Sequence, residues 1–192
     1  RTGGNDYGTL ADAITAAQAG DVVEILESGT YTLPAELSSI TIKAAEDVRA
    51  VVDYSAQSGG LGKFTDVTFE GITFKFGTAD YTGFQQSGMI TFKTCTLEGK
   101  FFSYGDMSFE GCTFQAPGGE YSMWCYAGNI SYTDCIFNGA GKFLNVYNEG
   151  NTEVPWKIKV DGCTFNSTKA SKAALNVKET SGSNLLKYDV ET

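Results

Sequence analysis

The amino-acid sequence predicts an all-β solenoid of about six to seven stacked coils, and three observations predict it. One eight-residue pattern recurs five times, at intervals of 17 to 28 residues. Each copy alternates apolar and polar residues with period 2, and each has a break in its middle, so it encodes two short strands with one buried face. A strand-like repeat of this length is typical of stacked coils. The copies are VTFEGITF, ITFKTCTL, MSFEGCTF, ISYTDCIF and IKVDGCTF, starting at residues 67, 90, 107, 130 and 158.

The break falls at the fourth and fifth positions of the pattern, in pairs such as Glu70-Gly71 and Thr133-Asp134. Gly and Asp tolerate a left-handed backbone, which lets the chain turn a corner between strands. The third and sixth positions are both apolar, although they are three residues apart. A flat strand cannot point both inward, so the alternation must slip by one at a bend.

Stacking places equivalent positions in columns, with side chains about 4.8 Å apart. The eighth position is aromatic in four copies, and offset-stacked rings suit a long, narrow core. The sixth position is Ile72, Cys95, Cys112, Cys135 and Cys163. We interpret these thiols as buried apolar residues. A disulfide or a metal site is the less favoured alternative, because a linear column neither brings Cβ atoms close enough for a disulfide nor converges on a metal ion.

The N-terminal segment predicts a cap over residues 1–20. Residues 9–19 form an amphipathic helix in this prediction, with Thr9 as N-cap and Gly20 as its end. Such a helix closes the open end of a solenoid. The coils then occupy about residues 21–192 of a single domain, 1–192, and we expect them to continue beyond residue 192.

The order of these pieces resembles a known superfamily. A helix, then the strand-like DVVEIL and ESGTYTL, then the repeated pattern is similar to the start of a pectate-lyase-like right-handed parallel β-helix. The resemblance covers nearly the whole chain. It implies right-handed coils and a secreted or cell-surface bacterial protein.

The resemblance also implies catalytic motifs, which the chain does not match. Lyases of this superfamily typically use an Arg or Lys base and clustered acids that bind calcium, but the two arginines here, Arg1 and Arg49, lie outside the middle coils. Hydrolases of the fold use an adjacent Asp pair, which this sequence lacks. Pectin esterases share only the Gly-x-Tyr seen at Gly29-Thr30-Tyr31. We therefore assign no catalytic residue.

Other catalytic constellations are equally poor. The sequence has no His, which excludes Ser-His-Asp triads and histidine metal sites. Acids at the fourth position (Glu70, Glu110 and Asp161) leave a glycosidase-like pair as an alternative, because neighbouring coils can give the required carboxyl spacing of about 5–9.5 Å. Lys93 and Thr133 interrupt that column, so solvated acids are the favoured interpretation.

Two further motifs remain alternatives. Residues 148–153 (NEGNTE) concentrate oxygen atoms in one loop, but they lack the Asp-rich spacing of calcium loops, so we interpret them as a polar loop. Thr73, Thr96, Thr113 and Thr164 form an outward column, as in some ice-binding solenoids. Ice binders generally need two such columns on one face, so we interpret this column as ordinary strand surface. We predict no metal site and no cofactor.

Charge and hydropathy limit the partners. A net charge of −9 argues against nucleic acid, whose binding needs clustered Lys and Arg. The sequence also lacks an apolar run of 18 residues, so we predict no insertion into a membrane.

Outward aromatic residues are the strongest functional signal. The third strand of each coil falls in segments such as KFFSYGD and YSMWCYAGN. If Cys125 points inward, its neighbours point outward, where flat rings can stack on sugars and Asn side chains can donate hydrogen bonds. The candidate ligand-binding residues are Trp124, Tyr126, Asn145, Tyr147 and Trp156, with Asn176 in the same column as Asn145 and with Tyr81 and Tyr121 in nearby loops. The alternative is that loops fold over these rings and bury them.

These patterns predict a non-catalytic extracellular or cell-surface module that is adhesin-like, glycan-binding or a rigid stalk. Its expected partner is a polysaccharide or a host or cell-surface glycan. The alternative function is a polysaccharide lyase or glycoside hydrolase that acts on acidic polysaccharide. Fold alone does not decide between them.

Overall fold

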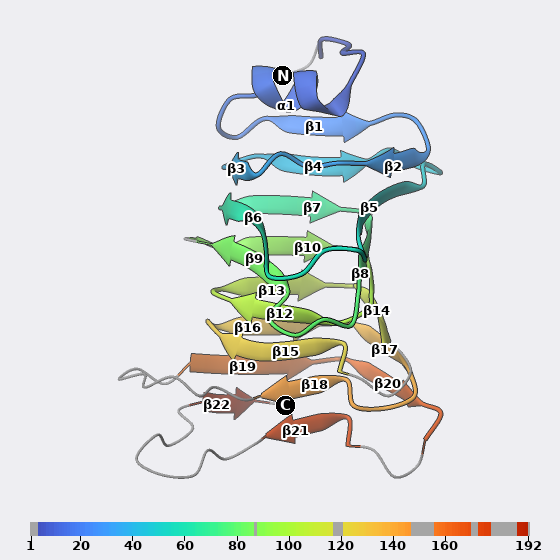
Figure 1. Ribbon diagram of the computed structural model, residues 1–192, viewed down its shortest axis with the longest axis vertical. Helices are drawn as coiled ribbons and strands as arrows, with labels where there is room; N and C mark the ends of the chain where they lie inside the picture. The colour runs from blue at the N-terminus through green and yellow to red at the C-terminus, as the bar shows by residue number, and fades with distance from the viewer. Residues whose placement is uncertain are drawn as a thin grey trace.

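The protein is a stack of parallel strands, covered at its N-terminal end by a short helix (Figure 1). The computed structural model describes residues 4–86, 88–116, 121–146, 156–169, 173–177 and 188–191. Every strand pair in these residues is parallel, and strands that neighbour one another in a sheet come from successive coils. The arrangement is all-β and is compatible with a parallel β-helix.

Two large sheets hold the strands of the repeated pattern. The eight-stranded sheet contains, in spatial order, β1 (Val22–Ile25), β4 (Thr41–Ala44), β7 (Val67–Glu70), β10 (Ile90–Lys93), β13 (Met107–Glu110), β16 (Ile130–Thr133), β19 (Trp156–Asp161) and β22 (Tyr188–Glu191). The seven-stranded sheet contains β2 (Gly29–Tyr31), β5 (Ala50–Tyr54), β8 (Thr73–Phe76), β11 (Thr96–Glu98), β14 (Thr113–Ala116), β17 (Ile136–Gly139) and β20 (Thr164–Ser167). Each copy of the pattern contributes one strand to each sheet, as predicted.

The bend between these two strands is a left-handed backbone position in every copy. The fifth residue of each copy has a positive φ: Gly71 (68°), Thr94 (49°), Gly111 (60°), Asp134 (53°) and Gly162 (63°). Residues with a Cβ enter this region rarely, and Asp enters it more often than most, which explains why Gly and Asp occupy most of these positions. The predicted corner is confirmed.

A third side of the stack is made of two smaller sheets. The three-stranded sheet contains β3 (Glu36–Ser38), β6 (Gly60–Thr65) and β9 (Gly83–Gln86), and the four-stranded sheet contains β12 (Phe101–Tyr104), β15 (Met123–Ala127), β18 (Leu144–Val146) and β21 (Leu175–Val177). The Phe102 N–H donates to the Thr82 carbonyl (2.8 Å), which links β12 to the start of β9. The two sheets therefore follow one another along one side (Figure 1).

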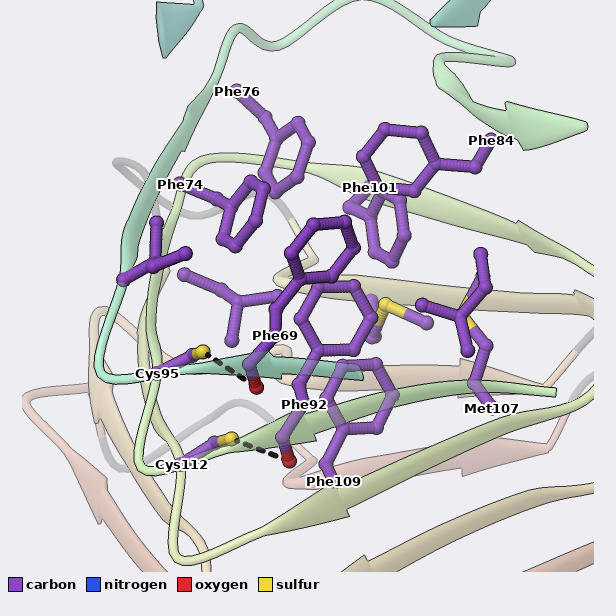
Figure 2. Packing of buried hydrophobic residues seen from close by; sticks show 14 of the residues in the cluster. Phe69, Phe74, Phe76, Phe84, Phe92, Cys95, Phe101, Met107, Phe109 and Cys112 are labelled. Atoms are coloured by element: carbon purple, nitrogen blue, oxygen red, sulfur yellow. Dashed lines mark hydrogen bonds between the residues drawn. The ribbon is translucent and has the colours of Figure 1, made fainter. Parts of the chain in front are cut away.

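Aromatic columns fill the interior. Residues at the third position stack from coil to coil, with centroid distances and interplanar angles of 5.5 Å and 31° for Phe69–Phe92, 4.9 Å and 9° for Phe92–Phe109, and 5.1 Å and 6° for Phe109–Tyr132. Figure 2 shows the three Phe rings of this column beside the rings of the neighbouring strands. All four side chains are 0% exposed. The predicted columns are confirmed, and they form the hydrophobic core.

The N-terminal helix is shorter than predicted. Helix α1 spans Leu10–Ala16, and the Thr9 hydroxyl caps it by accepting from the Asp12 N–H (3.1 Å). The prediction of a helix that runs to residue 19 and stops at Gly20 is wrong, because Ala17 already has an extended backbone. Gly20, with φ +87°, serves instead in the turn into β1. Leu10, Ala13, Ile14 and Ala17 are partly buried against the core.

The number of coils agrees with the predicted six to seven. The strands from β1 to β21 form seven coils of three strands each, and β22 adds one further strand to the eight-stranded sheet. Strands β3, β6 and β9 were not predicted. Strand β9 lies within residues 77–88, a stretch whose Gly and polar residues predict a loop.

Candidate functional site

Strands β12 and β15 direct aromatic side chains away from the core. Alternation turns Phe101, Met123 and Cys125 inward, and all three are at most 1% exposed. Phe102 pairs with Trp124 in the register of the two strands, so both side chains point outward. Tyr126 points to the same side as Trp124, because it lies two residues further along β15.

The outward rings form one contact network, which we call the outer aromatic cluster. Its members are Tyr81, Phe102, Tyr104, Tyr121, Trp124 and Tyr126. The Phe102 and Trp124 rings are stacked, with centroids 4.8 Å apart and an angle of 16°. Tyr81 packs on Phe102 at 5.3 Å and meets Tyr126 edge-on at 6.2 Å.

The cluster lies outside the interior core. Phe102 is 1% exposed but is not part of the interior hydrophobic cluster. Other outer rings cover it: Tyr81, Trp124 and Tyr126. Trp124 and Tyr126 are themselves half-buried, whereas Tyr81 is 54% exposed. The outside of the coil therefore carries an aromatic platform with a buried centre and a partly exposed surface.

A β-bulge fixes the backbone that carries Tyr126. Between Phe102 and Tyr104 on β12, the partner strand β15 has one extra residue. The buried Ser103 hydroxyl accepts from the Tyr126 N–H (3.0 Å) and donates to the Ala127 carbonyl (2.8 Å). A bulge leaves backbone N–H and C=O groups without partners in the neighbouring strand, and the Ser103 hydroxyl acts as the hydrogen-bond partner for both groups here.

Tyr104 connects the cluster to the preceding loop. Its hydroxyl donates to the Tyr81 carbonyl (2.8 Å), and its ring meets Tyr126 at 5.8 Å. Burial, and then the neighbouring Tyr126 and Tyr81, raise the pKa of Tyr104 above its usual value. The hydroxyl is therefore a stable donor at neutral pH.

The other end of the cluster carries a cation. Tyr121 meets the Trp124 ring edge-on at 5.7 Å. The Lys142 ammonium lies 5.3 Å from the centroid of the Tyr121 ring, a cation–π distance. The cluster thus runs from Tyr81 at one end to Tyr121 and Lys142 at the other.

The predicted binding residues fall in different places. Trp124 and Tyr126 lie together in the cluster. Asn145 follows Trp124 in the outward column but is 2% exposed, and its Oδ1 accepts from Asn176 Nδ2 at 2.7 Å, so it braces neighbouring coils. Trp156 begins β19 in the eight-stranded sheet, not in the four-stranded one. Tyr147 lies outside the described residues.

Two members of the cluster, Phe102 and Tyr104, are absent from the predicted set. The signal for them was present, since KFFSYGD alternates around an inward Phe101. The double Phe obscured it, because either ring could have been assigned to the core.

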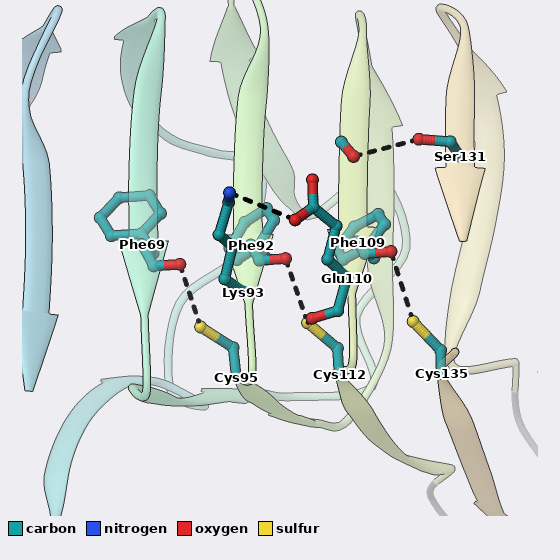
Figure 3. Close-up of polar contacts among 10 residues, drawn as sticks. Phe69, Phe92, Lys93, Cys95, Phe109, Glu110, Cys112, Ser131 and Cys135 are labelled. Carbon is teal, nitrogen blue, oxygen red and sulfur yellow. Dashed lines mark hydrogen bonds and ion pairs between the residues drawn. The ribbon is translucent and has the colours of Figure 1, made fainter. Parts of the chain in front are cut away.

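The acids of the eight-stranded sheet are balanced by lysines. Glu24, Lys43, Glu70, Lys93 and Glu110 follow one another in one outward column. Lys43 Nζ lies 2.9 Å from Glu24, and Lys93 Nζ lies 3.2 Å from Glu110 (Figure 3). The hydrogen bond and charge of Glu24 raise the pKa of Lys43. Alternating charges make this column an ion-pair ladder rather than a pair of converging carboxyls.

Three thiols of the cysteine column, Cys95, Cys112 and Cys135, are buried as predicted, whereas Cys163 is only half-buried. All five cysteines are free. Cys95, Cys112 and Cys135 donate to the carbonyls of Phe69, Phe92 and Phe109 on the preceding coil, at 3.5, 3.3 and 3.5 Å (Figure 3). Burial raises the pKa of the Cys125 thiol to about 12 and also raises that of Cys163. Such thiols are poor nucleophiles at neutral pH.

Within the described ranges, no group of three or more Cys, Asp or Glu side chains could hold a metal ion. In the same part of the chain, no helix is long and apolar enough to span a membrane.

Comparisons with protein-family models, with curated proteins and with solved structures find no match to this chain.

Proposed function

We propose that this protein is a non-catalytic glycan-binding module of a secreted or cell-surface bacterial protein. In this proposal its coils wind to the right, in the manner of the pectate-lyase-like superfamily, and hold the outer aromatic cluster as the binding surface. Right-handed connections between parallel strands are strongly favoured, which supports the handedness.

The observation that carries the proposal is an aromatic platform outside the core. Trp124 stacks on the buried Phe102, and Trp124, Tyr81 and Tyr126 present partly exposed rings on the outside of the sheet. The apolar faces of sugar rings stack on such surfaces, and Tyr hydroxyls and the indole N–H supply polar contacts. The interior columns already provide a core, so the fold does not require this second set of rings.

The chemistry of the other faces favours binding over cleavage. A glycosidase needs one protonated and one ionised carboxyl on either side of a glycosidic bond. Here Glu24 and Glu110 each pair with a lysine of the same column. The alternative function, a lyase or hydrolase of acidic polysaccharide, is therefore the outcome that would replace the proposal, and the same experiment tests it.

The experiment is a panel of soluble polysaccharides in affinity gel electrophoresis, together with assays for reducing ends and unsaturated products, with and without calcium. The proposal expects retardation by at least one polymer and no cleavage. Trp124→Ala and Tyr126→Ala should weaken binding about tenfold each, because each removes a stacking surface. Tyr7→Ala is the matched control, since Tyr7 is 42% exposed but lies in the N-terminal cap.

Three results contradict the proposal. Cleavage of any polymer would favour the enzyme. Retardation that survives both Trp124→Ala and Tyr126→Ala would move the binding surface elsewhere. Failure of every polymer to bind would leave a structural stalk as the simpler function.

A further inference from the structure

The loop formed by residues 77–82 is held firmly against the next coil. Three of its carbonyls accept hydrogen bonds from that coil: Gly77 from the Lys100 N–H (2.9 Å), Tyr81 from the Tyr104 hydroxyl (2.8 Å) and Thr82 from the Phe102 N–H (2.8 Å). Gly83, which follows the loop, lies so close that a Cβ there would come within 2.2 Å of the Phe102 carbonyl oxygen. The loop is therefore preorganised.

This anchoring presents Tyr81 in an uncommon conformation. Tyr81 has a φ of +60°, a region that bulky side chains seldom enter. Such positions persist only where the surroundings fix them, and they concentrate at functional sites. The ring is 54% exposed and leans on Phe102 and Tyr126. The loop thus holds an exposed aromatic ring at the edge of the outer aromatic cluster.

Asp80, next to Tyr81, carries an exposed and fixed carboxylate. Its Oδ1 accepts from Lys100 Nζ at 2.6 Å. The Lys100 side chain is only 5% exposed, whereas that of Asp80 is 59% exposed. The ion pair therefore hides its cation and shows its anion to solvent. Among the described residues, no hydrogen bond to Asp80 Oδ2 is seen, so this oxygen remains available to a ligand.

We infer that Asp80 and Tyr81 form a subsite for one neutral hexose unit of the glycan. The inference rests on the proposed function. The Tyr81 ring stacks on the apolar face of the sugar, and the Asp80 carboxylate accepts hydrogen bonds from adjacent hydroxyl groups of the same unit. Hydrogen bonds to an ionised acceptor are the strong ones, so Asp80 determines specificity.

Charge selects a neutral sugar over an acidic one. A uronate placed on Tyr81 would bring its carboxylate beside that of Asp80, and the nearby Lys100 ammonium is buried and already paired. The net charge of −9 adds to the repulsion. Lys142 lies over Tyr121, at the other end of the series of ring contacts that begins at Tyr81.

The test compares soluble neutral polymers (a β-glucan, a mannan and a galactan) with polygalacturonate, by calorimetry at 0.05 and 0.5 M salt. Wild type should bind a neutral polymer with an affinity that salt does not change. Tyr81→Ala should weaken binding about fivefold to tenfold, whereas Tyr81→Phe should retain it. Asp80→Asn combined with Lys100→Met, which removes both charges together, should weaken it about tenfold.

The controls separate this inference from the proposed function. Tyr7→Ala should bind as wild type does, and thermal unfolding shows whether each variant is folded. If Trp124→Ala abolishes binding but Tyr81→Ala does not, the subsite is wrong and the proposed function stands. Preferential binding of polygalacturonate would likewise show that the Asp80–Tyr81 subsite is wrong while the proposed function stands. The sugar would then contact the end of the outer aromatic cluster that carries Lys142. If no polymer binds wild type, the proposed function fails, and the subsite fails with it.

Discussion

The protein carries two sets of aromatic side chains, one inside the stack and one outside it. The interior column of Phe69, Phe92, Phe109 and Tyr132 has one ring in each of four successive coils, neighbours at interplanar angles of 31°, 9° and 6°, and no exposed surface. The outer aromatic cluster has tilted and edge-on contacts as well as a stack, and only Phe102 is fully covered. The interior set follows the repeat, whereas the outer set occurs only where β12 meets β15.

This difference distinguishes aromatic residues that the fold requires from aromatic residues that are available for binding. A column that recurs in four successive coils is explained by stacking and burial alone. A cluster that appears once, and whose loop is held in an uncommon conformation, has no such explanation. Perturbing matched residues in the two sets should therefore affect different properties.

The largest expected effect is on the interior. Phe109→Ala should lower the free energy of unfolding by about 3–5 kcal/mol, because Phe109 is enclosed by Phe92 and Tyr132 and its removal leaves a cavity. Phe102→Ala removes an equally buried ring, but its neighbours border solvent and can close the space, so we expect about 1–3 kcal/mol. Urea unfolding measures both. Equal costs would mean that the outer aromatic cluster belongs to the structural core.

The interior should also respond to alkaline pH. The Cys125 thiol, 0% exposed, has its pKa raised to about 12 by burial, against about 9 in the unfolded chain. The native state keeps this proton while the unfolded state loses it. The contribution of the Cys125 thiol to the free energy of unfolding is therefore fully present below about pH 9. It falls as pH rises from there to about 12, by at most about 1.4 kcal/mol per pH unit.

Cys125→Ser should remove this part of the pH dependence, because Ser keeps a hydrogen-bonding group towards the Tyr132 hydroxyl, which lies 3.3 Å from the Cys125 sulfur, and does not titrate in this range. Urea unfolding at pH 8, 9 and 10 under reducing conditions compares the two proteins. Trp124→Ala should keep the wild-type slope. Parallel curves for wild type and Cys125→Ser would contradict the burial argument.

A single methyl group added where loop 77–82 packs against β12 should lower the stability of the protein. In Gly83→Ala the Cβ would lie 2.2 Å from the Phe102 carbonyl oxygen, so the strands must separate, at a cost of about 1–3 kcal/mol. Gly60→Ala is the control on the paired strand, where a Cβ first meets the flexible end of Gln85 at 3.2 Å. Thermal unfolding should show a lower midpoint for Gly83→Ala alone. An equal drop of the unfolding midpoint in both variants would argue against close packing of Gly83 on β12.

The smallest change in stability is expected from removing an ion pair on the eight-stranded sheet. Lys93 and Glu110 are both close to half-exposed, so their ion pair should contribute about 0.2–1 kcal/mol. A double-mutant cycle with Lys93→Met and Glu110→Gln measures this coupling. It should shrink in 0.5 M salt and leave glycan binding unchanged. A loss of binding would transfer the site to the charged face.

The repeated parts of the fold were predictable from the sequence, and the single features were not. The columns that include Phe92 and Cys112 and the bend at Gly111 follow from a pattern seen five times. Strands β3, β6 and β9 lack that pattern, and the Gly residues that begin β6 and β9 are typical of loops. The predicted helix end is wrong because Gly20 is a strong stop signal, whereas the helix ends at Ala16, where the chain turns towards β1.

The candidate site was predicted only in part, for the same reason. Trp124 and Tyr126 follow from alternation around Cys125. The place of Phe102 depends on coil-to-coil register, and that of Tyr81 depends on hydrogen bonds from Tyr104 and Phe102. These contacts join segments that lie outside the repeated pattern, so the pattern does not predict them.

The most direct test of the central claim, that the outer aromatic cluster is the binding surface, is the fluorescence of one indole. The chain has two Trp residues, so Trp156→Phe leaves Trp124 as the only indole. Titration of this variant with the β-glucan, mannan, galactan and polygalacturonate should give a saturable change in Trp124 emission with at least one polymer, at the affinity that calorimetry measures. A polymer that binds by calorimetry without changing Trp124 emission, or no change with any polymer, would contradict the claim.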